Sequence, residues 1–189
     1  REHFDYYFNE CMTGFEYQVA AHMIAEGMVQ EGLAVTRTIH DRYHPIRRNP
    51  WNEVECGDHY ARAMASYGVF LAACGYEYHG PKGRLGFFPR ISPENFRGAL
   101  TAAEGWGTYW QRTEGDKLAA GIQLQYGRLR LHTLRLGPLP KAVPKTVGVQ
   151  LDGKPVPARI AAADRQRAEI QLTEPLTIEA GQRLAIELH

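Results

Sequence analysis

The chain has 189 residues, 44% of them hydrophobic, which is enough for one ordinary domain with a buried core and argues against a disordered chain. Lysine and arginine number 22 against 21 acidic residues, and this net charge of +1 excludes the long-range positive field that nucleic acid or an anionic membrane would require. Residues 1–10 lack the apolar stretch of a signal peptide, and no later run approaches the ~20 apolar residues of a membrane span. We therefore expect a soluble protein with a neutral partner, and a cytoplasmic location is favoured.

The first eighty residues have the spacing of helices. Between Asp58 and Gly75, apolar residues recur every three or four positions, which predicts a helix that Gly75 ends. The same spacing predicts an earlier helix ending near Gly32 and another over 35–46, before Asn49-Pro50. Short connections between such helices make neighbours antiparallel.

After Gly75 the sequence favours turns and strands. Six glycines and prolines between 80 and 93 break any helix, so only a short one, from Pro93 to about Ala102, is expected there. Residues 122–136 alternate apolar and polar side chains, which is the period of a half-buried strand, with a bulge or bend at Gly127. Short apolar runs at 147–151, 168–172, 176–178 and 184–188 predict further strands, and residues 138–144 are a candidate linker. This part of the chain is predicted to be antiparallel β.

Three cysteines, Cys11, Cys56 and Cys74, are widely and unevenly spaced. An odd count at these spacings gives neither a disulfide framework nor a paired zinc motif, so we expect three buried thiols. A metal site formed by Glu55, Cys56 and His59 is an alternative, but no His-x-x-x-His or Cys-x-x-Cys spacing supports it. No metal or other cofactor is therefore expected.

The densest polar cluster, RRNPWNEVECGDHYAR at 47–62, fills a predicted loop and enters the next helix. Asp58 is suited to cap that helix, and Arg62 to pair with it one turn later, so both have a structural explanation. Alternatively, Arg62 and either Glu53 or Glu55 hold sugar hydroxyls while Trp51 packs on the sugar ring. The two glutamates share one face of an extended backbone, which is an awkward geometry for a glycosidase catalytic pair, so they are not assigned as catalytic.

Two further clusters contain polar or aromatic residues. Thr13 and Glu16 match a capping box, which gives Glu16 a structural explanation, whereas Glu10 before them has none. Trp106 and Trp110 lie in the segment TAAEGWGTYWQR. Either tryptophan could be a sugar platform, but we favour the interpretation that they seal a core against strands.

Three strings carry a family resemblance: NECMTGFEYQVAAHMI, RNPWNEVECGDHYARAMASY and TAAEGWGTYWQR. They resemble the C-terminal catalytic region of glycoside hydrolase family 116, the family of β-glucosidases and the non-lysosomal glucosylceramidase, from about Asn9 to Arg112. That family has an (α/α)6 barrel and a retaining mechanism whose Glu nucleophile and Asp acid/base lie upstream of these strings. The resemblance implies an α+β chain, with the terminal helices of an (α/α)6 barrel in residues 1–118 and an antiparallel β tail in residues 119–189.

The same resemblance implies site residues and partners. The sugar-holding Glu and Arg of the family, nine residues apart, fall on Glu53 and Arg62, and Glu10 is a weaker third candidate for the same pocket. The implied substrate is a β-glucoside or a glucosylceramide-like lipid, and the implied partner is the upstream part of the same enzyme. Because no catalytic residue is expected in this chain, we expect the chain alone to be an inactive fragment. The alternative is a non-catalytic carbohydrate-binding or assembly module.

Overall fold

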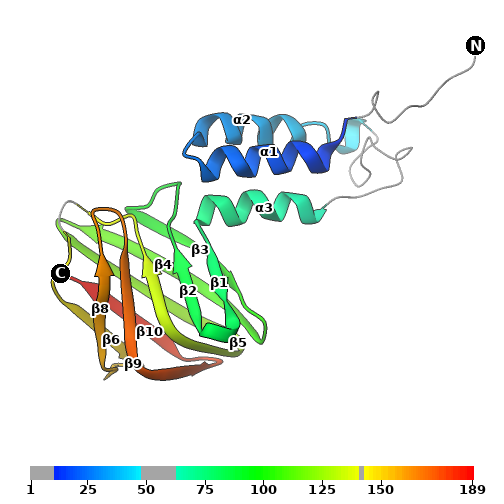
Figure 1. Ribbon diagram of the computed structural model, residues 1–189. Helices are drawn as coiled ribbons and strands as arrows, with labels where there is room; N and C mark the ends of the chain where they lie inside the picture. The colour runs from blue at the N-terminus through cyan, green and yellow to red at the C-terminus, as the bar shows by residue number, and fades with distance from the viewer. Residues whose placement is uncertain (1–10, 48–62, 141–142) are drawn as a thin grey trace, which may run out of the picture. The chain divides into compact units, whose positions relative to one another are not determined.

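The computed structural model describes residues 11–47, 63–140 and 143–189. They form two compact units, divided between Ala73 and Cys74 (Figure 1). The first, which we call the helical unit, contains the α-helices, and the second, the β unit, contains the strands.

The helical unit contains α1 (Thr13–Ala25), α2 (Val29–His40), the short 3-10 helix η2 (Pro45–Arg47) and α3 (Ala63–Cys74). Its core consists of Ala20 and Ile24 from α1 and Val69 from α3, with Leu33 and Val35 of α2 packed against them. None of the described helices is long and apolar enough to cross a membrane.

The first helix ends earlier than the sequence pattern predicts. α1 stops at Ala25 because Gly27, with a φ of +91°, turns the chain, and α2 starts at Val29. Gly32, predicted to end the first helix, is buried inside α2, where a Cβ would lie 2.7 Å from the carbonyl oxygen of Ala20. This glycine therefore allows helix packing and does not end a helix.

The β unit is a ten-stranded sheet, counted over the described residues, that folds into two layers (Figure 1). The strands are β1 (Glu77–His79), β2 (Arg84–Phe87), β3 (Asn95–Thr101), β4 (Gly105–Glu114), β5 (Lys117–Leu136), β6 (Val147–Leu151), β7 (Lys154–Pro155), β8 (Ala158–Ala163), β9 (Ala168–Glu179) and β10 (Arg183–Leu188), with the 3-10 helix η4 (Gly80–Lys82) between β1 and β2.

The long strand β5 belongs to both layers. Its first half pairs with β4 and β10, giving the order β3-β4-β5-β10-β6-β7, which we call the β10 layer. Its second half pairs with β9 and β2, giving the order β1-β2-β5-β9-β8, which we call the β9 layer. The change of partners occurs at Gly127, which has a φ of +68°.

Buried side chains fill the space between the layers. Phe87 of β2 stacks on Tyr109 of β4, with ring centroids 3.8 Å apart and an angle of 2° between the ring planes. Burial raises the pKa of the Tyr109 hydroxyl, which therefore remains a protonated donor to Oε1 of Gln111 at 2.6 Å. Most of the surrounding core is leucine and isoleucine from β5, β9 and β10. The inner face of β4 is thus held rigidly by aromatic stacking and a buried hydrogen bond.

The fold implied by the family resemblance, the terminal helices of an (α/α)6 barrel followed by an antiparallel β tail, is wrong. The described chain is mainly a ten-stranded sheet with three α-helices. The sheet is mixed, because β2 and β5 pair in parallel. The helix predicted from Pro93 to Ala102 is also wrong, because Asn95–Thr101 forms β3 and pairs along its whole length with β4. The strands predicted at 122–136, 147–151 and 184–188 are confirmed.

Two of the three cysteines lie in the described part of the chain. Cys74 is buried, as predicted, whereas Cys11 is exposed. Burial raises the pKa of the Cys74 thiol to about 11, and the reactive form of cysteine is the thiolate. In a Cys11→Ser/Cys56→Ser variant we expect Cys74 to react slowly with a disulfide reagent at pH 8 and about tenfold faster with each pH unit up to pH 10. A rate that levels off below pH 9 would contradict the raised pKa, and a variant retaining only Cys11 provides the exposed control.

Candidate functional site

The sugar-holding residues predicted from the sequence, Glu53, Arg62 and Glu10, lie outside the described residues, and so do Trp51 and Asp58. Their roles stay predictions. The site described below lies in the β unit and uses different residues.

The predicted capping box of α1 is not formed. Met12 is the N-cap residue without a side-chain cap, and the hydroxyl of Thr13 donates to the carbonyl oxygen of Cys11 at 3.3 Å. Glu16 instead forms an ion pair with Arg42, just beyond α2. Glu16 therefore has a structural role, but it ties two segments of the helical unit together.

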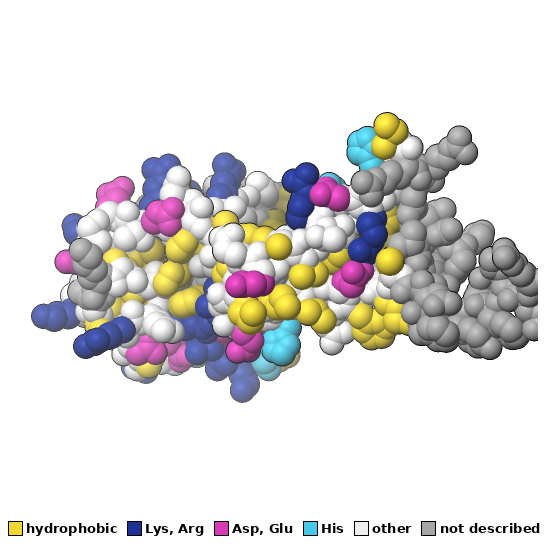
Figure 2. Space-filling view, turned by 90° about the horizontal axis from the view of Figure 1, so that it is seen from above, with side chains coloured by type: hydrophobic (Ala, Val, Ile, Leu, Met, Phe, Trp, Pro, Cys, Tyr) yellow, Lys and Arg dark blue, Asp and Glu magenta, His cyan; other side chains and the backbone are white. Residues whose placement is uncertain are grey.

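A hollow of about 480 Å³ lies on the helical unit, lined by Cys11, Met12, Phe15, Glu16, Val19 and Val35. It is mostly apolar, and Phe15 and Val19 are exposed by 60% and 49%. Hydrophobic side chains are visible at the surface among charged ones in Figure 2. The carboxylate of Glu16 is already paired with Arg42, so the hollow offers little to orient a polar ligand.

Within the described ranges, no group of three or more His, Cys, Asp and Glu side chains is placed to hold a metal ion.

The side chains of β4 point alternately to the core and to the outer face, and those on the outer face form the candidate site. Its outward side chains are Trp106, Thr108, Trp110 and Arg112, while Tyr109 between them is fully buried. Because successive side chains of a strand point to opposite faces, these four residues lie along the outer face of the β10 layer. The same strand thus joins the core on one side to an aromatic and polar surface on the other.

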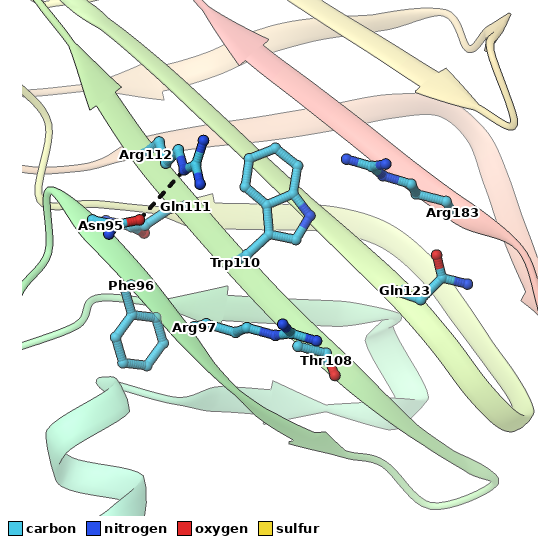
Figure 3. A pocket seen from close by; sticks show the side chains of 9 residues that line it. All are labelled: Asn95, Phe96, Arg97, Thr108, Trp110, Gln111, Arg112, Gln123 and Arg183. Carbon is cyan, nitrogen blue, oxygen red and sulfur yellow. Dashed lines mark hydrogen bonds between the residues drawn. The ribbon is translucent and has the colours of Figure 1, made fainter.

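Neighbouring strands complete a pocket of about 450 Å³ on this outer face (Figure 3). Its lining residues are Asn95, Phe96, Arg97, Thr108, Trp110, Gln111, Arg112, Gln123 and Arg183. They come from β3, β4, β5 and β10, so the pocket exists only when these four strands are paired. Its volume falls in the range typical of small-ligand sites.

Trp110 is the aromatic centre of the pocket. A Cβ at Gly121, its partner on β5, would lie 2.6 Å from Nε1 of the indole, so the ring covers the glycine. Ala185 of β10 pairs with Gly121 on the other side, so the sheet surface beside the ring carries only small side chains. The guanidinium of Arg183 lies 5.4 Å from the centroid of the Trp110 ring, within cation–π distance. The indole is therefore fixed against the sheet and edged by a cation.

Polar groups surround this ring. Nε of Arg112 donates to Oδ1 of Asn95 at 3.3 Å, which orients both side chains at one side of Trp110 (Figure 3). Nε2 of Gln123 donates to the carbonyl oxygen of Gly181 at 3.0 Å, which fixes the amide at the other side. The pocket thus combines one apolar surface with guanidinium and amide groups held in defined positions.

A second aromatic surface lies four residues along β4, about 13 Å from Trp110 at the usual rise of a strand. Trp106 stacks with Tyr126, with ring centroids 6.1 Å apart and an interplanar angle of 17°. The two side chains are 50% and 63% exposed. Beside them, Arg128 donates to Glu104 at 2.7 Å, and this hydrogen bond lowers the pKa of the Glu104 carboxyl. The outer face therefore presents two aromatic surfaces in a row.

The interpretation that Trp106 and Trp110 seal the core is wrong. The core side of β4 is occupied by Tyr109 and Gln111, both fully buried, and the tryptophans alternate with them on the outer face. The sequence contained this signal, because Trp106, Trp110 and Arg112 are spaced by even numbers around Tyr109. The contribution of Arg183 had no such local signal, since this residue lies on β10, which is far from β4 along the chain.

Comparison with protein-family models and with curated proteins gives no match. Among solved structures, the chain is similar to a glycoside hydrolase with 14% identity and a TM-score of 0.34, over 68% of this chain and 19% of that one. It is also similar to the alpha-L-rhamnosidase from Dictyoglumus thermophilum, with 9% identity and a TM-score of 0.36, over 80% of this chain and 17% of that one. Both of these proteins are glycoside hydrolases, and this chain spans less than a fifth of the length of either. At these TM-scores the likeness says nothing about the site.

Proposed function

We propose that this chain is a carbohydrate-binding part of a glycoside hydrolase, with the pocket around Trp110 as its sugar site. The observation that carries the proposal is the indole ring lying over Gly121 in a pocket edged by guanidinium and amide groups. A sugar ring has an apolar face of C–H groups and an edge of hydroxyls. The face packs on an aromatic ring, while the hydroxyls bond to charged and amide side chains.

The second aromatic surface extends the proposal from one sugar to a chain of sugars. Trp106 and Tyr126 lie on the same outer face as Trp110 and are largely exposed. Contiguous exposed apolar surface is typical of binding sites. An oligosaccharide lying along β4 would cover both aromatic surfaces.

Truncating the exposed tryptophans of β4 is expected to weaken oligosaccharide binding. In the full chain, Trp110→Ala should reduce affinity about 30-fold, the effect of losing a central aromatic anchor, and Trp106→Ala should have a smaller effect on short ligands. Isothermal titration with three- to six-unit cello-, xylo- and galacturono-oligosaccharides measures this. The control is Phe15→Ala, which removes an exposed aromatic on α1, in the helical unit. If none of these oligosaccharides binds at millimolar concentration, or if Trp110→Ala binds like the wild type, the proposal is wrong.

We also propose a catalytic assignment, which rests on the family-116 resemblance. The chain is assigned to a retaining β-glucosidase or glucosylceramidase-like enzyme. Glu53 and Arg62, with Glu10 as a third candidate, are assigned to hold the glucose unit. The nucleophile and the acid/base are supplied by another segment of that enzyme. The support for this assignment is the long string at 48–67, which contains both of the main residues at the required separation.

Arg62 offers a direct test of that assignment. In an active enzyme that contains this chain, Arg62→Ala is expected to raise the KM for an aryl β-glucoside about 10- to 100-fold, because a hydrogen bond from a charged group contributes roughly 1.5–3 kcal/mol. Arg62→Lys keeps the charge and should show a smaller effect. An unchanged KM and kcat in Arg62→Ala would remove this residue from the site.

A further inference from the structure

We infer that the sugar bound at Trp110 is acidic, and that Arg97, Arg112 and Arg183 recognise its carboxylate. This inference rests on the proposed function and adds the chemical class of the ligand. It differs from the neutral partner expected from the net charge of +1, because a net charge averages over the molecule and does not describe one face.

The charges lining the pocket are all of one sign. Three of its nine lining residues are arginines and none is acidic. Glu114 and Glu187 also project from the outer face of β4 and β10, but neither lines the pocket, and Glu187 lies 3.5 Å from His189. Positive charges gathered around a concave surface favour an anionic ligand and disfavour a cationic one.

These three arginines also differ from others in the β unit. Arg128, Arg135 and Arg167 each form an ion pair with a glutamate, at 2.7, 2.8 and 2.6 Å. In the described part of the chain, Arg97, Arg112 and Arg183 form no ion pair.

Instead, the contacts of Arg112 and Arg183 are with neutral groups. Nε of Arg112 donates to an amide oxygen, and the Arg183 guanidinium lies 5.4 Å from the centroid of the Trp110 ring, at its edge (Figure 3). A guanidinium presents several donors in a planar fork that fits a carboxylate, so these groups retain donors for one.

The arrangement of the three cations surrounds a single ligand position. Arg97 lies directly opposite Trp110 in the pairing of β3 with β4, and Arg112 lies two residues along β4, about 7 Å away. Arg183 projects from β10 on the other side of the ring (Figure 3). A sugar ring stacked on the indole would therefore have a guanidinium on three of its sides to receive a carboxylate.

Other anions fit the pocket less well. A free phosphate or sulfate ion would use the arginines but not the indole or the sheet surface beside it at Gly121 and Ala185. Single-stranded nucleic acid would use both, but it needs a continuous basic track along its backbone, and Glu114 and Glu187 interrupt such a track on the same outer face. An acidic oligosaccharide uses the aromatic surface and the guanidiniums together.

The test compares matched ligands on the full chain by isothermal titration. The probes are trisaccharides of galacturonate and of glucuronate and the neutral sugars made from each by reducing its carboxyl groups. At least one acidic probe is expected to bind about tenfold or more tightly than its reduced form, and to lose several-fold in affinity between about 50 and 500 mM NaCl. Arg112→Gln and Arg183→Gln should lower the affinity for that probe by a larger factor than the affinity for its neutral form, so that the preference for the acidic sugar shrinks. Arg159→Gln, on β8, is the matched control and should change neither.

Each other outcome has a defined meaning. Equal binding of acidic and reduced sugars overturns this inference and leaves the proposed sugar site in place, whereas no sugar binding overturns both. Inorganic sulfate or phosphate binding as tightly as the acidic sugar, or a thymidine oligonucleotide binding more tightly than either, overturns the inference in favour of a free-anion or nucleic-acid site. The wild-type comparison needs no variant, so the inference remains falsifiable even if a substituted chain does not fold.

Discussion

Replacing Gly127 with alanine is expected to lower the free energy of unfolding of the β unit by about 3 kcal/mol or more. Two costs add at this position. The φ of +68° is unfavourable for any residue with a Cβ, and that Cβ would lie 1.9 Å from the carbonyl oxygen of Glu104. The backbone of the turn between β3 and β4, where Glu104 lies and accepts a hydrogen bond from the backbone N–H of Arg128, cannot move away as a flexible side chain would. Urea denaturation followed by circular dichroism measures the loss, and the Trp106–Tyr126 stack next to this position should change its fluorescence.

The control for Gly127 is a glycine with a similar backbone and open space around it. Gly115 has a φ of +62°, and a Cβ added there would meet nothing within 4 Å, so Gly115→Ala should cost only the conformational part, about 1–2 kcal/mol. Gly148→Ala, with neither a positive φ nor a neighbour within 4 Å, should be close to neutral. If Gly127→Ala lowers the free energy of unfolding no more than Gly115→Ala does, then the change of partner strands in β5 does not require the close approach between Gly127 and the carbonyl oxygen of Glu104.

Truncating Tyr109 to alanine is the second substitution with a large expected effect. The side chain is fully buried, stacks on Phe87 at 3.8 Å and donates a hydrogen bond to Gln111. Removing it leaves a cavity between the layers and an unpaired amide oxygen, with an expected loss of about 3–5 kcal/mol. Thermal and urea denaturation measure this loss, and sugar binding at Trp110 on the same strand should weaken with it.

Tyr109→Phe separates the two parts of that loss. It keeps the stack on Phe87 and removes only the hydroxyl, so the expected cost is about 1–3 kcal/mol from the unsatisfied Oε1 of Gln111. A double variant, Tyr109→Phe/Gln111→Leu, also removes the hydrogen bond that Nε2 of Gln111 donates to the carbonyl oxygen of Pro93 at 2.8 Å, so it should be less stable than Tyr109→Phe alone. Equal losses for Tyr109→Phe and Tyr109→Ala would mean that the ring stacking contributes little between the layers.

The strands of the β unit were predictable where one face is buried and the other is not. Residues 122–136 alternate because Ile122 and Leu124 enter the core while Gln123 faces the pocket. Such alternation is a local signal and needs no knowledge of the partner strand. The prediction of an irregularity at Gly127 had the same local basis, because glycine within a strand often marks a bulge.

Other parts depended on partners far along the chain. Asn95–Thr101 has no strong strand pattern, and it becomes a strand because β4 pairs with it along its whole length. The early end of α1 is hidden in the sequence because Gly27 and Gly32 are the same residue type with different roles, one turning the chain and the other packing against Ala20. The implied barrel failed for a different reason, since a likeness in three strings does not determine how the intervening residues pair.

The candidate site was predictable only in part. The alternation around Tyr109 places Trp106, Trp110 and Arg112 on one face, a local signal that the core interpretation of the tryptophans overlooks. Arg183 lies about 70 residues from Trp110 along the chain, and only the pairing of β10 with β5 brings it to the pocket. When a site is formed by residues from several strands, the strand order determines which residues meet, and no local sequence pattern encodes that order.

The position of β10 in the sheet has a consequence for synthesis on the ribosome. β10 is inserted between β5 and β6, although Arg183–Leu188 follows both of them in the chain. Until these six residues leave the exit tunnel, β5 and β6 each present an unpaired hydrogen-bonding edge next to apolar side chains, which is a template for association with other chains. The nascent β unit is therefore expected to depend on chaperone protection until its final strand is available, and to complete its fold in a single late step.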